Sequence, residues 1–297
     1  MARMNQNIVI PDNTKLVNNL DFLDSEIESV KFGQSIEISG NYIFARCNKI
    51  QNLDVPNGTI ISGYGLLYCS NGLQNLTIGE NVSLLGNYIF QNCPNLESLA
   101  IGHSTTIRGN SIFSGSIGLQ RLQFSPNTTF SGSYLFSECN MIQEVIIPDN
   151  CRISADFFFK NCQGLERIVI GNNVEIQGSQ CFYECSGLKS ITIGDNVTIS
   201  GLKFLEGCFV NQNVELTIGH NYVGYPINIP APIFQIVKFA DIKGKIRYET
   251  KKCMISLEKF VDDSNVIVLN CGHVFLVEPL RQWLEIRKNC ATCRQKI

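Results

Sequence analysis

The feature that most constrains the fold of this chain is an internal repeat of about 23 residues. Aromatic or leucine anchors recur at steps of 22 to 24 residues: Phe22, Phe44, Leu66, Phe90, Phe113, Phe136, Phe159, Phe182 and Leu205. A period of this size is typical of repeat proteins in which each repeat forms one coil of a solenoid. Single repeats of this kind cannot bury a core alone, so the sequence predicts a stacked, elongated array.

Each repeat carries the same order of small, apolar and turn residues. A small residue, usually cysteine, follows each anchor by three positions: Ser25, Cys47, Cys69, Cys93, Ser116, Cys139, Cys162, Cys185 and Cys208. An apolar triplet such as Leu165, Ile168 and Ile170 comes next, and a turn, a second apolar pair and a glycine follow. The short alternating segments predict strands in a parallel ladder. The glycines are expected to supply positive φ at the corners.

The cysteine column could be a set of metal ligands or disulfides, but the pattern argues against both. Equivalent positions in neighbouring coils are expected about 4.8 Å apart, which suits a buried stack of thiols. Ser116 occupies the same column, which indicates that the position requires a small residue rather than a metal ligand. We therefore expect the cysteines of the repeats to be reduced and inaccessible.

The repeat, C-x-x-L-x-x-I-x-I with an upstream F-x-x-C and a downstream N-V-x-I-x-G, resembles the BspA-like subclass of leucine-rich repeats. The resemblance covers roughly residues 8–225 and implies a mainly β repeat solenoid, which we assign to residues 1–226. It also implies a recognition surface rather than a catalytic domain.

A candidate binding surface lies on the outward columns between the buried positions. Ile146 and Val169 form a small apolar patch, which Arg121, Glu144 and Arg167 flank. This patch is our candidate for binding a protein substrate. The alternative is that these residues are ordinary strand formers on the exposed face of a ladder.

The repeat register breaks after Pro226, and the composition changes. Pro226, Pro230 and Pro232 mark a stiff connector, and residues 227–250 are assigned to a linker. From residue 238 to the end, twelve Lys/Arg and seven Asp/Glu give +5, whereas the whole chain carries −2. This surplus is modest and lacks interleaved aromatic residues, so that it does not indicate nucleic-acid binding.

The remaining segment, residues 251–297, contains Cys271-x-His273 and Cys290-x-x-Cys293. Three thiolates and one imidazole form a natural tetrahedral zinc set. Each pair is close enough in sequence to form one knuckle, and the 16 residues between the pairs leave room for a helix around Trp283. The sequence therefore predicts a small zinc-stabilised module.

The pattern C-G-H-x-F…L-x-x-W-L…C-x-x-C-R resembles a RING finger, an α+β module that holds two zinc ions in most members. The four ligands named above match the second zinc site of that family. The first site would use Cys253 and the positions of Ser256, Leu276 and Pro279. Only the cysteine is a ligand, so the resemblance implies one zinc ion.

The resemblance also implies a function, that of a ubiquitin ligase that acts by proximity without a covalent intermediate. Ile255 and Trp283 match residues that dock the ubiquitin-conjugating enzyme, and Ala291 stands where the family carries a proline. Arg294 matches the basic linchpin that contacts ubiquitin. The solenoid would bind the protein substrate, and the module would recruit the conjugating enzyme.

Two alternatives stay open at this point. One is a non-catalytic interaction scaffold with a degenerate zinc module, which Ser256, Leu276, Pro279 and Ala291 favour. The other is a surface adhesin, as BspA-like repeats elsewhere can be. Against the adhesin, the first residues contain only a three-residue apolar run, too short for a signal peptide. No stretch reaches the roughly 18 apolar residues of a membrane span. We therefore expect a soluble, intracellular protein of the cytoplasm, with neither nucleic acid nor membrane as a partner.

Overall fold

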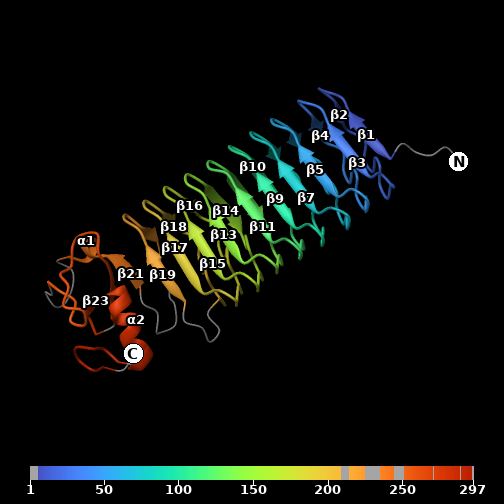
Figure 1. Cartoon of the computed structure of the whole chain (residues 1–297). Coiled ribbons are helices and arrows are strands. Elements are labelled where there is room, and N and C mark those ends of the chain that lie inside the picture. Colours follow the sequence, from blue (N-terminus) through green and yellow to red (C-terminus); the bar gives the residue numbers. More distant parts are fainter. Residues whose placement is uncertain are drawn as a thin grey trace.

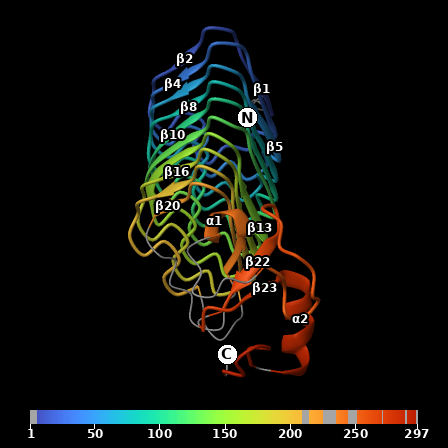
Figure 2. The same ribbon diagram turned by 90° about the vertical axis from the view of Figure 1, so that its left-hand side faces the viewer.

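The computed structural model describes residues 6–208, 214–224, 235–243, 251–269, 271–287 and 289–295. The chain is an elongated stack of coils with a small module at its C-terminal end (Figure 1). Turning the molecule shows two ladders of strands that run the length of the stack, with the module below its last coils (Figure 2). The predicted β solenoid with a period of about 23 residues is confirmed.

The first ladder contains the four-residue strands. These are β1 (Asn7–Ile10), β3 (Ser29–Phe32), β5 (Asn52–Val55), β7 (Asn75–Ile78), β9 (Ser98–Ile101), β11 (Arg121–Phe124), β13 (Glu144–Ile147), β15 (Arg167–Ile170), β17 (Ser190–Ile193) and β19 (Glu215–Ile218). Neighbours pair in parallel, and the ladder is interrupted between β3 and β5 and between β11 and β13. Alternate residues point inward: in β15, Ile168 and Ile170 are buried, whereas Arg167 is exposed.

The second ladder is one continuous parallel sheet of shorter strands. It contains β2 (Lys15–Leu16), β4 (Glu37–Ile38), β6 (Ile60–Ile61), β8 (Ser83–Leu84), β10 (Thr106–Asn110), β12 (Thr129–Ser133), β14 (Arg152–Asp156), β16 (Glu175–Ile176), β18 (Thr198–Ile199) and β20 (Val223–Gly224). The apolar residues of both ladders pack against the anchor residues on a third side of each coil. Phe113, Phe136 and Phe159 are fully buried there and stack with ring centroids 5.1 Å apart at both steps.

The repeated glycines have a different role from the one expected. Gly178 and Gly201 do not have positive φ. Instead, a Cβ at Gly201 would lie 1.9 Å from the carbonyl oxygen of Gly178, and one at Gly178 would lie 2.0 Å from that of Ala155. The coils approach so closely at these two glycines that no side chain fits there. Positive φ occurs mostly at non-glycine turn residues such as Asn173 and Asn196, because asparagine tolerates this region well.

The buried column of cysteines is confirmed. Its thiols are fully buried and free, and each donates to the carbonyl oxygen of the residue 26 positions earlier, as Cys162 does to Phe136 at 3.2 Å. The other members are Cys47 (25 positions from its acceptor), Cys93, Cys139, Cys185 and Cys208. The cysteines therefore form hydrogen bonds between coils, and their side chains are small enough to fit the column.

One position of the predicted column was wrong. Cys69 is partly exposed, and the buried residue in its coil is Ser70, whose hydroxyl donates to the carbonyl oxygen of Phe44 at 3.2 Å. The anchor of this coil is accordingly Leu67, which lies 23 residues after Phe44. Leu66 and Leu67 are both apolar and both buried, so the apolar pattern alone does not distinguish the two registers.

We expect Cys93 and Cys139 to resist a thiol reagent in the native protein near neutral pH, whereas Cys69 reacts. Burial raises the pKa of both column thiols to about 12 from an ordinary 9.0, which lowers the thiolate fraction on the order of 1000-fold. Mass spectrometry of peptides after brief labelling measures this. Rapid modification of Cys139 without denaturant would contradict the buried column.

The sheet of the solenoid continues into the C-terminal module. Strand β21 (Gln235–Lys238) pairs in parallel with β19 and antiparallel with β22 (Asn265–Val268), which pairs with β23 (Val274–Leu276). A helical turn, α1 (Phe239–Ile242), follows β21, and helix α2 (Val277–Ile286) follows β23. The described part of the segment that the sequence analysis assigned to a linker is therefore a strand and a helical turn.

Within the described part of the chain, two ion pairs join the module to the last coil. Arg281 of α2 contacts Glu215 of β19 at 2.9 Å, and His220 Nδ1 lies 2.8 Å from Asp241 Oδ1 of α1. Neither pair was expected from the sequence. Among the described residues, no helix has the length and apolar character that a membrane span requires.

The pair between His220 and Asp241 should make the junction sensitive to pH. The hydrogen bond and charge of Asp241 raise the pKa of His220 above 6.5, with a smaller effect of Asp195 in the same direction and of Lys238 in the opposite one. The stabilising contribution is therefore full below about pH 6.5 and is lost as the pH rises through the raised pKa. NMR titration of the imidazole should give a lower pKa in Asp241→Asn; an unchanged pKa would show that the pair does not form.

Candidate metal centre and docking surface

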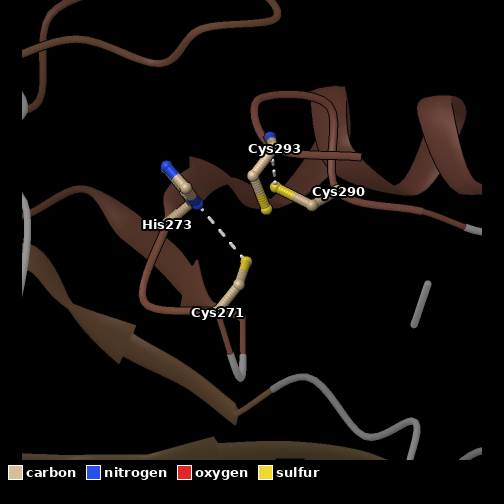
Figure 3. Close-up of side chains that lie close together, drawn as sticks. All are labelled: Cys271, His273, Cys290 and Cys293. Carbon is tan, nitrogen blue, oxygen red and sulfur yellow. Dashed lines mark hydrogen bonds between the residues drawn. The ribbon is translucent and has the colours of Figure 1, made fainter. Parts of the chain in front are cut away.

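Four predicted ligands converge at one end of the module. Cys271 and His273 lie in the turn between β22 and β23, and Cys290 and Cys293 lie in the loop after α2. Their side chains point toward one another (Figure 3), and their ligand atoms all lie within 4.8 Å of one another. This is the one group of three or more potential metal ligands among the residues that the structure describes.

The donor set fits zinc. Zinc binds sulfur at about 2.3 Å and imidazole nitrogen at about 2.0–2.1 Å, so its tetrahedral ligands lie roughly 3.4–3.8 Å apart. His273 Nδ1 is 3.3 Å from Cys271 Sγ, which places Nδ1 rather than Nε2 toward the centre. Only small inward movements of the remaining atoms are needed to close a tetrahedron around an ion.

The loop that carries Cys290 and Cys293 has the backbone of a metal knuckle. The amides of Thr292 and Cys293 donate to Cys290 Sγ at 3.4 and 3.5 Å. The amide of Arg294, where φ is 63°, donates to the carbonyl oxygen of Cys290 at 2.9 Å, and the amide of Cys290 donates to that of Gln295 at 2.9 Å. Amide donors around a sulfur stabilise its thiolate, which is the form that binds metal.

The thiols of the centre differ in their affinity for protons. Burial raises the pKa of Cys271 to about 11, and the neighbouring thiols Cys290 and Cys293 act in the same direction. The amide of Gln295 lowers the pKa of Cys293. Several thiolates in one small space repel one another, and a divalent cation would relieve that repulsion.

Helix α2 connects the two halves of the metal centre. It begins directly after β23, and Pro279 lies in its first turn, where the missing N–H costs no helical hydrogen bond. Leu280 is fully buried in the core of the module. The indole Nε1 of Trp283 donates to the carbonyl oxygen of Asn289 at 2.9 Å, which attaches the helix to the loop that holds Cys290.

The residues expected to dock a conjugating enzyme come from three segments. Ile255 lies in the loop after Cys253 and is partly buried against the core of the module. Trp283 is on α2, and Ala291 is in the knuckle after it; both are partly exposed. Arg294 follows the last ligand and is exposed. The bond between Trp283 and Asn289 links two of the three segments.

The candidate substrate residues lie on the outward face of the first ladder. Ile146 and Val169 are direct neighbours in the pairing of β13 with β15, and Ile146 is 50% exposed. Glu144 and Arg167 are also paired there and form a salt bridge of 2.5 Å. Arg121 is on β11, beyond the interruption of the ladder. The patch therefore spans β13 and β15, with Arg121 at its border.

The solenoid shares a continuous sheet with a module that carries a Cys₃His cluster. This combination is that of a repeat protein with a C-terminal zinc-finger module. Residues 3–119 and 83–215 match, in six copies, the family model described as the BspA type leucine-rich repeat region. The chain therefore belongs to the BspA-type leucine-rich-repeat family. Residues 251–294 match the model described as the Ring finger domain.

Curated relatives are similar to this chain over short stretches. The probable E3 ubiquitin-protein ligase HIP1 of Oryza sativa subsp. japonica is 35% identical over 57 residues, which is 19% of this chain and 8% of that protein. The E3 ubiquitin-protein ligase RING1-like of Arabidopsis thaliana is 35% identical over 52 residues, 18% of this chain and 16% of that protein. An uncharacterized RING finger protein of Schizosaccharomyces pombe is 28% identical over 88 residues, 30% of this chain and 17% of that protein. No solved structure matches the chain.

Proposed function

We propose that this protein is a RING-type ubiquitin ligase in which the solenoid binds the substrate protein and the module recruits the ubiquitin-conjugating enzyme. The observation that carries the proposal is the convergence of Cys271, His273, Cys290 and Cys293 within a segment that matches the Ring finger domain. The names of two relatives, both E3 ubiquitin-protein ligases, support it.

In this proposal the module supplies position rather than a nucleophile. The ubiquitin carbonyl is held as a thioester on the conjugating enzyme, and the amine of a substrate lysine attacks it. The C–S bond breaks, an isopeptide bond forms, and the amine loses a proton as the thiol is released. The reaction is accelerated because the thioester and the substrate lysine are held in one complex. Arg294 would donate hydrogen bonds to ubiquitin and the conjugating enzyme through its planar guanidinium.

We propose that the module holds one zinc ion, in the centre formed by the four ligands. Zinc there joins the turn between β22 and β23 to the loop after α2, which fixes Trp283 and Ala291 relative to each other. The positions of a first zinc carry Cys253, Ser256, Leu276 and Pro279, and only the cysteine is a strong zinc ligand. That site does not fit a second ion.

Substrate binding is assigned to the outward face of the first ladder, around Ile146 and Val169. The side chain of Ile146 is half exposed in the middle of a long, regular surface, and the neighbouring charges of Glu144 and Arg167 are paired with each other. An apolar centre with paired charges at its rim suits a protein partner. The free thiols throughout the described residues fit a reducing compartment, and we place the protein in the cytoplasm.

A non-catalytic scaffold is the second candidate. Ala291 in place of the family's proline and the dismantled first zinc site favour it. Incubating the full chain with ubiquitin, activating enzyme and a broad panel of conjugating enzymes separates the two. Conjugates that depend on the chain are expected with at least one conjugating enzyme, whereas absence of transfer throughout the panel would favour the scaffold.

A further inference from the structure

The loop after Cys253 has the backbone of a zinc knuckle although it lacks the second ligand. The amide of Cys253 donates to the carbonyl oxygen of Glu258, and the amide of Leu257 donates to that of Cys253, both at 2.8 Å. The same two bonds, five and four residues apart, occur at Cys290 with lengths of 2.9 Å. Leu257 has a φ of 63°, as Arg294 has in the metal knuckle.

No metal ion explains this geometry. Ser256 stands where the second ligand of a knuckle belongs, and its hydroxyl hydrogen-bonds Glu258 at 3.4 Å. Leu276 and Pro279, at the other two positions, have no donor atom in their side chains. The family leads one to expect a zinc ion here, yet the residues present supply one thiol.

Cys253 makes both of the backbone bonds that close this turn, one through its amide and one through its carbonyl oxygen. Cys253 is fully buried in the core of the module. Burial raises the pKa of its thiol, but the amides of Ser256, Ile255 and Leu276 together with the Ser256 hydroxyl outweigh burial and lower it. Ile255 and Leu276, which ends β23, both pack against the core that contains Cys253, so this core joins the first loop to the start of α2, the two segments that a first zinc would connect.

The segment between solenoid and module closes the base of the same loop. The ring of Phe239 on α1 stacks on that of Phe260 with centroids 4.8 Å apart. The amide of Phe260 donates to the carbonyl oxygen of Lys251 at 3.1 Å, and Lys252 and Lys259 form an antiparallel bridge. Both ends of the loop are therefore fixed by hydrogen bonds and by packing against α1.

We infer that Cys253 is a positioning residue whose sulfur, together with the stack of Phe239 on Phe260, holds the loop of residues 253–258 in place of the first zinc and thereby sets Ile255 for conjugating-enzyme docking. The inference rests on the proposed function for its last step. The position of Ile255 follows that of the loop because Ile255 lies inside the turn that the backbone bonds of Cys253 with Glu258 and Leu257 close, and it packs against the core that contains Cys253.

The test compares Cys253→Ala and Cys253→Ser with wild type in the full chain, and Cys69→Ala serves as a control at a partly exposed cysteine outside the module. In Cys253→Ala we expect the conjugating-enzyme concentration for half-maximal transfer to rise about tenfold, with little change in maximal rate. Zinc content should stay the same as in wild type. Cys253→Ser keeps an acceptor and should recover most of the affinity, which a lost metal ligand would not allow.

Hydrogen–deuterium exchange of the loop gives a readout independent of activity. Amides of residues 254–258 and of Leu276 should exchange faster in Cys253→Ala than in wild type, and should stay slow in Cys253→Ser. If wild type transfers no ubiquitin but this exchange pattern holds, the ligase proposal fails while the role of the sulfur in the loop stands. The inference is overturned if exchange and half-maximal concentration are unchanged in Cys253→Ala, or if wild type holds two zinc ions and the variant one. If Cys253→Ala loses its zinc, the test rests on Cys253→Ser, provided that this variant holds as much zinc as wild type. Fast amide exchange of the loop in Cys253→Ser then overturns the inference, and slow exchange supports it.

Discussion

Replacing both Cys290 and Cys293 by serine is expected to abolish zinc binding and to unfold the C-terminal module while the solenoid stays folded. A structural zinc contributes about 10–16 kcal/mol of apparent folding free energy in small peptides at neutral pH, which is more than a core of this size supplies alone. The module has its own small core, separate from the continuous core of the coils. The solenoid should therefore retain its packing when the zinc ligands are lost.

Native mass spectrometry and hydrogen exchange measure the two parts of this prediction. We expect one zinc ion in wild type and none in the double variant. Amides of β22, β23 and α2 should lose protection, whereas those of β13, β15 and β17 keep it. Cys69→Ser is the matched control, since it removes a thiol outside the metal centre. A double variant that keeps its zinc, or loses the solenoid together with the module, would contradict the assignment.

Arg294→Ala is expected to lower ubiquitin transfer about 10- to 150-fold while the zinc and the fold remain. Charge-assisted hydrogen bonds contribute roughly 1.5–3 kcal/mol, and each 1.4 kcal/mol changes the rate about tenfold. The exposed side chain of Arg294 follows the last metal ligand, and its backbone, with a φ of 63° and an amide bond to Cys290, is part of the knuckle. Alanine keeps that backbone bond, so the substitution removes the side chain beyond Cβ, including the guanidinium, and leaves the knuckle in place.

The matched control is Arg287→Ala, which removes an exposed arginine at the end of α2. Its transfer rate should stay within about twofold of wild type, because surface substitutions away from a contact have small effects. Zinc content should be equal in the two variants. If Arg294→Ala transfers ubiquitin at the wild-type rate, Arg294 is not a linchpin, and the protein is described better as a scaffold.

The local patterns of the sequence predicted a large part of this structure. The repeat predicted the coil length and the inward positions, because a side chain's direction in a strand depends only on its place in the alternation. The recurrence of a cysteine once per repeat predicted the buried column, apart from Cys69. The metal centre was equally local: Cys271 and His273 are two residues apart, Cys290 and Cys293 three apart, and each pair meets within one turn. The sequence alone therefore determined a β solenoid with a Cys₃His centre after it.

Tertiary structure decided the features that depend on which neighbours are present. The sequence placed Cys69 in the buried column, whereas the structure places Ser70 there. The apolar pattern fits either residue, and only the contact of this coil with the coil of Phe44 selects Ser70. Strand β21 is a strand because the last coil leaves the unpaired backbone of β19 at its edge, and exposed edges of this kind recruit a further strand. The bonds of Arg281 with Glu215 and of His220 with Asp241 follow from that pairing. A sequence pattern specifies what each segment prefers, whereas these contacts join segments far apart in the chain and exist only once the solenoid has formed.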